Sequence, residues 1–292
     1  MPNIPGIGLM RKNGLSSSFI ILAVFLSLSG GWLVIARLSA SDEKPAIEQG
    51  QLVYERNCAI CHGTLGDGRG MAAMMLRTKP RDFRPGIFKF RSTPTGSLPT
   101  DEDLFQTISQ GLRGTGMVTQ DHLSEAERRA VVEYLKTYSE RFQGQKAPSP
   151  ISIPKSLGMT PELITRGKEV YREAGCFACH GMEGRGDGPA ASELVDFWGY
   201  SIQPADLTRP LKRGSAAEAV YQTLVTGLDG TAMPSYQAAL SQDELWALAH
   251  YVSSLNTGVL SQDHVREEQA GRMVLQMHDG RSPGMMPRMP MR

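Results

Sequence analysis

The sequence contains little cysteine and almost no net charge. Of its 292 residues only four are cysteine, and 31 lysines and arginines nearly balance 30 aspartates and glutamates, so the formal net charge is +1. This balance gives no electrostatic reason to bind nucleic acid, which favours a basic excess. Long alternations of apolar and polar residues, typical of β-strands, are also missing. We therefore expect an all-α protein, and its length suffices for two small domains.

All four cysteines fall in two copies of one motif. "CAICH" begins at Cys58 and "CFACH" begins at Cys176, and the histidines that end them are His62 and His180. Cys-x-x-Cys-His is the pattern of covalent haem attachment, in which both thiols form thioethers to the porphyrin and the histidine binds the iron. A redox dithiol or a zinc site is the alternative, but neither requires a histidine after each pair. The motifs therefore predict two covalently bound haem c groups, attached through Cys58, Cys61, Cys176 and Cys179.

The segments around the two motifs repeat. A Gly-x-x-x-Tyr segment precedes each motif, beginning at Gly50 and Gly167, and "FQTISQGLRGTGM" in the first half is echoed by "YQTLVTGLDGTAM" in the second. Each repeat ends in a run with apolar residues at helical spacing, "VVEYLKTY" or "LWALAHYVSSL". The Ser-x-x-Glu spacing of a capping box, which predicts helix starts, occurs at Ser124, Ser215 and Ser241. The repeat predicts two helical domains, domain one over 46–142 and domain two over 161–257.

The second axial ligand of each iron is predicted from the same repeat. Met117 and Met233 follow His62 and His180 at nearly equal separations. Both methionines lie just after a glycine-rich turn, where a flexible backbone can bring the thioether toward the porphyrin. A thioether ligand favours the reduced iron and raises its reduction potential. We therefore predict His62, Met117, His180 and Met233 as the iron ligands.

Other candidates for the sixth ligand fit the repeat less well. His122 and His250 occupy unmatched positions in the two repeats. Met71, Met74 and Met75 follow the first motif too closely to reach the opposite face of a haem, and domain two has no counterpart of them. We expect these three methionines to fill the core.

With these motifs in place, the sequence resembles two tandem class I cytochrome c domains. In that family a small residue and an aromatic residue of the first helix pack against an aromatic residue of the last helix. The resemblance implies two such contacts, of Gly50 and Tyr54 with Tyr134, and of Gly167 and Tyr171 with Tyr251.

The resemblance also implies how the histidine ligands are oriented. In such folds a proline carbonyl accepts a hydrogen bond from the imidazole that binds the iron, and this bond fixes the tautomer. Pro80 and Pro204 stand at the corresponding positions. Domain one departs from the family pattern, because Val118 follows Met117 where a proline is usual.

Residues 1–40 are predicted to be a targeting segment. Arg11 and Lys12 precede an apolar run over 19–36, which reaches about 27 Å as a helix, close to the thickness of a bilayer core. The run predicts either an uncleaved transmembrane helix or a signal peptide that is cleaved after "LSA". Either one delivers the haem domains to the periplasmic side of a bacterial inner membrane.

Two further segments are expected to be flexible. Residues 143–160 are rich in proline, serine and glycine, and we predict a linker that lets the two domains move. Residues 258–292 are predicted to be a tail, and near its end lie Met285, Met286, Met289 and Met291. Because thioethers bind Cu(I), copper binding is an alternative role for this tail.

Basic residues gather in one segment of domain one. They are Arg77, Lys79, Arg81, Arg84, Lys89 and Arg91, with Asp82 as the one acidic residue among them. One interpretation is a solvated face on which one or two arginines pair with haem propionates. The other is a docking patch for an acidic redox partner. The first is favoured, because runs of charge are usually solvated faces.

Two fully ligated irons predict an electron carrier rather than an enzyme. Such a protein excludes water and tunes the haem potentials, so no catalytic residue is assigned. The expected partners are redox proteins, namely a quinol-oxidising complex, a dehydrogenase or a terminal oxidase, together with the membrane if the N-terminal run is uncleaved. An anchor followed by two such domains is similar to the dihaem subunit of cbb3-type oxidases. The alternative is a dihaem enzyme such as a peroxidase, which needs one haem with an open face.

Overall fold

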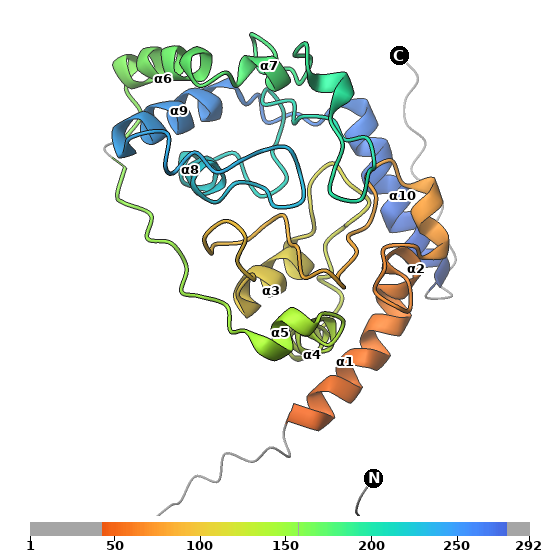
Figure 1. The fold of residues 1–292 in the computed structure, drawn as a ribbon. Helices are drawn as coiled ribbons and strands as arrows, with labels where there is room; N and C mark the ends of the chain where they lie inside the picture. The colour runs from red at the N-terminus through yellow and green to blue at the C-terminus, as the bar shows by residue number, and fades with distance from the viewer. Residues whose placement is uncertain (1–42, 157, 279–292) are drawn as a thin grey trace, which may run out of the picture. The chain divides into compact units, whose positions relative to one another are not determined.

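The computed structural model describes residues 43–156 and 158–278, which form helices and connecting loops (Figure 1). Within those ranges the one pairing of extended backbone is an isolated antiparallel bridge between Val195 and Ser201. The all-helical class predicted from the sequence is therefore confirmed. The apolar run over 19–36 and the methionine-rich end of the tail lie outside the described residues. In the described part of the chain, no helix is long and apolar enough to cross a bilayer.

Domain one is built around the crossing of its first and last long helices. Its elements are α1 (Glu43–Asn57), α2 (Ala59–His62), the 3-10 helix η1 (Met71–Met75), α3 (Asp101–Gln110), α4 (Glu125–Lys136) and α5 (Glu140–Gly144). α1 and α3 both pack against α4. The core is rich in aromatic residues, with Tyr54, Phe83, Phe88 and Phe105 buried around Val131. Because α2 follows α1 directly, this packing also fixes the Cys-x-x-Cys-His motif.

Domain two repeats the arrangement. Its elements are α6 (Pro161–Glu173), α7 (Phe177–His180), the 3-10 helix η2 (Ala191–Glu193), α8 (Ala217–Thr226) and α9 (Gln242–Leu255). α6 and α8 both pack against α9, and Val170, Tyr171 and Leu248 are almost fully buried at their contacts. Helices α6, α7, α8 and α9 therefore correspond to α1, α2, α3 and α4, as the sequence repeat predicts.

A glycine lets the first and last long helices of each domain approach closely. A side-chain carbon on Gly50 would overlap the carbonyl group of Ala130, and one on Gly167 would overlap that of Ala247. Beside each glycine two tyrosine rings meet, with 5.4 Å between their centroids, in the pairs Tyr54 with Tyr134 and Tyr171 with Tyr251. The packing implied by the resemblance is confirmed in both domains.

Capping boxes begin the last long helix of each domain. The boxes predicted at Ser124 and Ser241 are present at the starts of α4 and α9, each with a glutamate three residues later. The box predicted at Ser215 is wrong. The hydroxyl of Ser215 accepts a hydrogen bond from the backbone N–H of Leu211 instead, and Ala216 precedes α8 without a side-chain cap.

The segment 143–160 contacts both domains, which differs from the freely moving linker that its composition predicts. The backbone N–H of Ile151 donates to the carbonyl oxygen of Ser92 in domain one at 2.8 Å. Ile151 and Ile153 also pack against the core of domain two. Proline and serine content predicts mobility, but the two isoleucines supply apolar surface that is buried on contact.

Part of the expected flexible tail is a helix. α10 (Gln262–His278) contacts α1 of domain one, and Figure 1 shows α10 in blue beside the orange start of that domain. The buried carboxylate of Glu267 accepts hydrogen bonds from the backbone N–H groups of Thr78, at 3.2 Å, and Arg77, at 3.4 Å. The prediction of a tail is therefore wrong for this part. The prolines of the tail begin only after α10, so no proline interrupts the helix over 262–278.

Candidate haem sites

Each domain contains a cavity that brings the predicted haem residues together. One cavity is lined by Cys58, Cys61, His62 and Met117. The other is lined by Cys176, Cys179, His180 and Met233. All four thiols are unbridged, and within the described residues no three or more cysteine, histidine or carboxylate side chains gather as a metal cluster. The donor set of each cavity, two thiols, an imidazole and a thioether among apolar side chains, fits a covalently attached c-type haem.

A tyrosine of the first helix fixes the end of each haem motif. The hydroxyl of Tyr54 donates to the carbonyl oxygen of Gly63 at 2.8 Å, and the hydroxyl of Tyr171 donates to that of Gly181 at 2.6 Å. Each glycine directly follows the histidine of its motif. The tyrosine that packs the helix crossing therefore also sets the position of the histidine.

The imidazoles of the two motifs are held in the same way. His62 Nδ1 lies 3.1 Å from the carbonyl oxygen of Arg81, and His180 Nδ1 lies 2.9 Å from that of Ala205. Because a carbonyl oxygen can only accept, this bond places the proton on Nδ1 and leaves Nε2 available to an iron. Burial lowers the pKa of both imidazoles, that of His62 to about 4, which favours the neutral form that binds metal.

The carbonyl acceptors lie one residue beyond the prolines to which the resemblance assigns them. Pro80 and Pro204 line the two cavities. Their carbonyl oxygens, however, face Gly68 and Gly186. The prolines restrict the backbone next to each acceptor, so they stay close to the imidazole without being its hydrogen-bond partner.

The two predicted methionine ligands lie on turns with the same hydrogen bonds. In domain one the N–H of Leu112 donates to the carbonyl oxygen of Met117 at 2.7 Å, and the N–H of Met117 donates to the Thr115 hydroxyl at 3.1 Å. Domain two repeats both bonds, at 3.0 and 3.2 Å, with Leu228, Thr231 and Met233. The equivalence inferred from spacing thus extends to the turn geometry, although Val118 replaces the usual proline in domain one.

The rival ligands are engaged elsewhere. His122 Nε2 lies 3.2 Å from Asn57 Oδ1, and His250 Nε2 lies 2.8 Å from the hydroxyl of Ser156. Neither histidine lines a haem cavity. At least two thirds of the surface of each η1 methionine is exposed, so the prediction of core filling is wrong for Met71, Met74 and Met75.

Helix α10 covers the turn that carries the predicted methionine ligand of domain one. The carboxylate of Glu268 accepts a hydrogen bond from the N–H of Gly114 at 2.7 Å. Gly271 packs so closely that a side-chain carbon on it would overlap the carbonyl group of Gly116. Leu275 lines the cavity of domain one itself. Residues that follow domain two in the sequence therefore complete the haem cavity of domain one, a contact that no local pattern predicts.

Replacing Gly271 with valine is expected to displace α10 from this turn. The side chain would overlap the Gly116 carbonyl, so the helix cannot keep its position. Amide hydrogen exchange within 262–278 should rise at least several-fold in Gly271→Val. The matched control is Arg272→Val, which places valine at an exposed neighbouring position. It should leave the exchange rate nearly unchanged. Equal exchange in both variants would contradict this packing.

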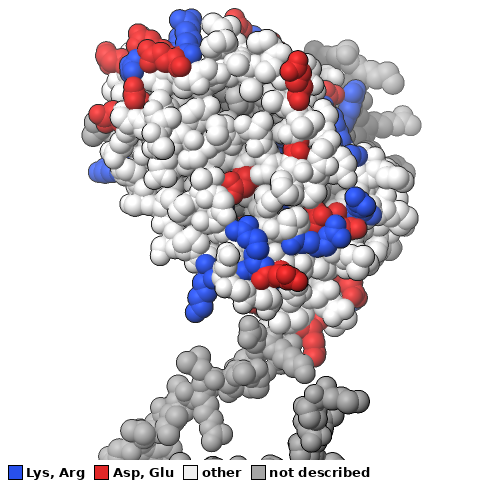
Figure 2. All heavy atoms as spheres, in the orientation of Figure 1, with Lys and Arg blue, Asp and Glu red and all other residues white. Residues whose placement is uncertain are grey.

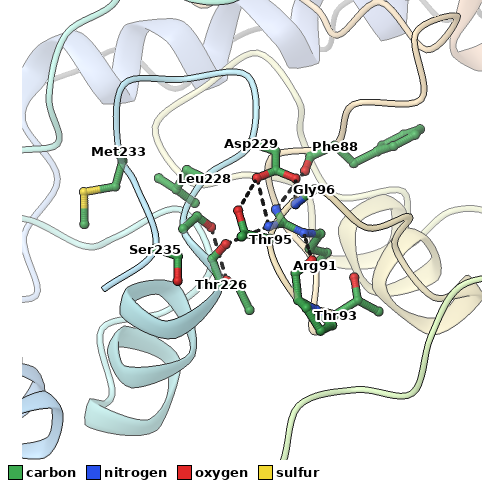
Figure 3. Close-up of polar contacts among 12 residues, drawn as sticks. Phe88, Arg91, Thr93, Thr95, Gly96, Thr226, Leu228, Asp229, Met233 and Ser235 are labelled. Carbon is green, nitrogen blue, oxygen red and sulfur yellow. Dashed lines mark hydrogen bonds and ion pairs between the residues drawn. The ribbon is translucent and has the colours of Figure 1, made fainter. Parts of the chain in front are cut away.

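A buried ion pair joins the two domains (Figure 3). The side chain of Arg91 in domain one is fully buried, and its Nη2 lies 2.9 Å from Asp229 Oδ1 in domain two. Asp229 also accepts hydrogen bonds from the Thr95 hydroxyl and the Gly96 N–H, and Arg91 Nη2 donates to the carbonyl oxygen of Thr226 at 2.6 Å. Because Asp229 lies within the methionine turn of domain two, the ion pair ties this turn to domain one.

Two arginines of the basic segment, Arg91 and Arg81, contribute to this contact between the domains. Besides Arg91, the guanidinium of Arg81 stacks on the Trp198 ring of domain two, 4.2 Å from its centroid. Lys79 Nζ instead donates to the carbonyl oxygens of Ala73 and Leu76. On the face shown in Figure 2, basic side chains lie among acidic ones and form no patch of a single sign.

Each of the two domains matches a family of known proteins. The family model "Cytochrome c" matches residues 164–256, and the model "Cytochrome C oxidase, cbb3-type, subunit III" matches residues 45–135. The chain belongs to the dihaem c-type cytochromes. A reducing HAO-like protein complex from Kuenenia stuttgartiensis contains a chain that is 45% identical to this cytochrome. The two structures match with a TM-score of 0.70 over 72% of this cytochrome and 96% of that chain.

Curated relatives of the cytochrome are more distant in sequence. The cbb3-type cytochrome c oxidase subunit CcoP of Helicobacter pylori is 24% identical over 49% of this chain and 41% of its own length. The subunit FixP of Azorhizobium caulinodans is 26% identical over 72% of this chain and 60% of its own length. The cytochrome thus spans about half the length of the curated relatives it matches. Its two domains fit two covalently bound haem c groups.

Proposed function

We propose that this cytochrome transfers electrons as a subunit of an oxidoreductase complex, with each iron held by a histidine and a methionine. The observation that carries the proposal is the grouping of His62 with Met117 in one cavity and of His180 with Met233 in the other. When bound, the haems supply one-electron exchange between Fe(III) and Fe(II). A fully ligated iron has no position for a substrate, so electron transfer is the chemistry that remains.

The residues of the chain keep each site rigid during that exchange. The carbonyl groups of Arg81 and Ala205 orient the imidazoles, and the hydroxyls of Thr115 and Thr231 fix the methionine turns. Buried aliphatic and aromatic side chains around both cavities exclude water. Little atomic rearrangement should then accompany the change in charge, which is the role of the protein in a carrier.

An HAO-like protein is the partner that the comparisons favour. The Kuenenia relative is part of such a complex, and nearly all of that chain matches this cytochrome at 45% identity. The cbb3 oxidase subunits match at 24 and 26% identity over smaller parts of their lengths. We therefore infer a redox complex of the HAO-like kind. Location in the periplasm and an N-terminal membrane anchor belong to the proposal as well, supported by the basic residues and apolar run within 1–40.

Titration of the haem-loaded protein tests the proposed function. Reduction should consume two electrons per chain, and the reduced wild type should bind no carbon monoxide and show no peroxide turnover, because both irons lack a free position. Met233→Ala is the control, since removal of the thioether should open one iron and allow carbon monoxide to bind. Carbon monoxide binding or peroxide turnover by the wild type would contradict the proposal and support a dihaem enzyme with one open site.

A further inference from the structure

The two haem cavities share one wall. Three residues line both cavities, Lys89 and Phe90 from domain one and Lys212 from domain two. The two lysines also line an adjoining polar cleft between the domains. A single layer of side chains therefore separates the interiors of the two domains at this place.

The shared wall contains two lysines whose side-chain nitrogens lack a paired carboxylate in the described part of the chain. Within the described residues, neither Lys89 nor Lys212 forms an ion pair or hydrogen bond through its ammonium group. Both side chains are half-buried. Burial, with Lys212 and Arg81 nearby, lowers the pKa of Lys89 to about 7, although Asp196 partly offsets the effect. Burial also lowers the pKa of Lys212. An anionic partner would offset this cost of burial and stabilise the charged form of both lysines.

A c-type haem carries two propionate groups, which are carboxylates. A carboxylate at the edge of an apolar cavity is stabilised by a charge-assisted hydrogen bond from an ammonium or guanidinium group. Lys89 and Lys212 each line both cavities, so either lysine borders the space available to each haem. We propose that Lys89 and Lys212 form one shared binding site that would hold propionates of both haems, at the wall where Phe90 also lines both cavities.

The shared site requires a fixed arrangement of the domains, and contacts beside it provide one. Arg213, next to Lys212, lines the cavity of domain two and donates to the Thr107 hydroxyl, which belongs to the wall of the domain-one cavity, at 3.2 Å. The guanidinium of Arg213 also lies over the Phe90 ring, 5.7 Å from its centroid. These contacts join domain two to domain one beside the shared wall. The site therefore has no equivalent in either domain taken alone.

The shared site couples the potentials of the two haems. A nearby positive charge stabilises the reduced iron relative to the oxidised iron, because reduction removes one positive charge from the haem. A lysine that serves one haem should influence one potential strongly. A lysine shared by two haems should influence both potentials. This difference distinguishes one shared propionate site from two separate sites that each serve one haem.

The test is a spectroelectrochemical titration of haem-loaded Lys89→Met and Lys212→Met, with haem methyl resonances in NMR spectra used to assign each potential to its haem. Each variant is expected to lower the midpoint potentials of both haems, and Lys89→Arg should retain values close to the wild type. Lys168→Met is the matched control, because Lys168 is exposed on α6, and it should shift neither potential. A shift confined to one haem, or no shift, would overturn the proposal.

This inference rests on the proposed function only in requiring haem in both cavities. Two covalent haems are detected independently, by the mass of the wild-type protein and by reversible reduction. If the wild type lacked them, the proposed function would fail first. The other outcome is that the wild type holds two haems that are reduced reversibly, while the lysine variants have the same potentials as Lys168→Met. The proposal of a shared site would then be contradicted, and the proposed function would stand.

Discussion

Replacing Asp229 with alanine is expected to destabilise the protein by about 3–5 kcal/mol, because the buried guanidinium of Arg91 would lose its carboxylate. The Arg91 side chain has no exposed surface, so water cannot replace the lost partner. The substitution also removes the acceptor of two further hydrogen bonds, from Thr95 and Gly96. The measurement is urea denaturation of the oxidised haem-loaded protein, followed by haem absorbance and by far-ultraviolet circular dichroism.

Two control variants separate the buried pair from a general effect of charge removal. The double variant Arg91→Met, Asp229→Ala removes both charges and should recover most of the stability, because no uncompensated charge stays buried. Glu173→Ala breaks an exposed pair with Arg166 and should change the free energy of unfolding by about 1 kcal/mol or less. A single variant as stable as the wild type, or a double variant without recovery, would contradict the assigned role of this ion pair.

Replacing Gly167 with alanine is expected to destabilise domain two by about 1–3 kcal/mol. Helix propensity alone predicts the opposite sign, since alanine favours a helix over glycine by about 1 kcal/mol. The added carbon would overlap the Ala247 carbonyl where α6 crosses α9, so the two helices would have to separate. Gly50→Ala should act in the same way on domain one, where it meets Ala130.

The matched control for the helix crossing is Gly144→Ala. Gly144 lies in α5, and a side-chain carbon there would meet no atom within 4 Å. Alanine at this position should be neutral or stabilising by up to about 1 kcal/mol. Thermal unfolding of the three variants under one set of conditions gives the comparison. Equal stability changes in Gly167→Ala and Gly144→Ala would show that close packing does not decide the effect.

The parts of the fold that the sequence predicts are those encoded by neighbouring residues. The Cys-x-x-Cys-His motif, the capping box at Ser124 and the helical periodicity of α9 each lie within a few turns of chain. The methionine turns can be predicted because the sequence repeat allows equivalent positions in the two domains to be compared. Both domains place Met117 and Met233 on the same turn, so the comparison between repeats compensates for the lack of local signal.

Contacts between distant segments were not predictable from those patterns. The basic segment is ambiguous in sequence, because Asp229, the partner of Arg91, lies more than a hundred residues away. The position of α10 depends on a fit between Gly271 and Gly116, which composition does not encode. The burial of the linker isoleucines is hidden in the sequence for the same reason, because it depends on surfaces that exist only in the folded protein.

The visible absorption spectrum of the oxidised protein tests the central claim most directly, because the weak thioether-to-ferric-iron band near its red end reports methionine ligation. The spectrum would be recorded for the haem-loaded wild type, Met117→Ala and Met233→Ala. We predict that the wild type shows the band, that each variant loses its own share of it, and that both retain two covalent haems. If Met117→Ala left the band unchanged and the wild type bound carbon monoxide, the iron of domain one would have an open face, and the account of two closed electron-transfer sites would be wrong.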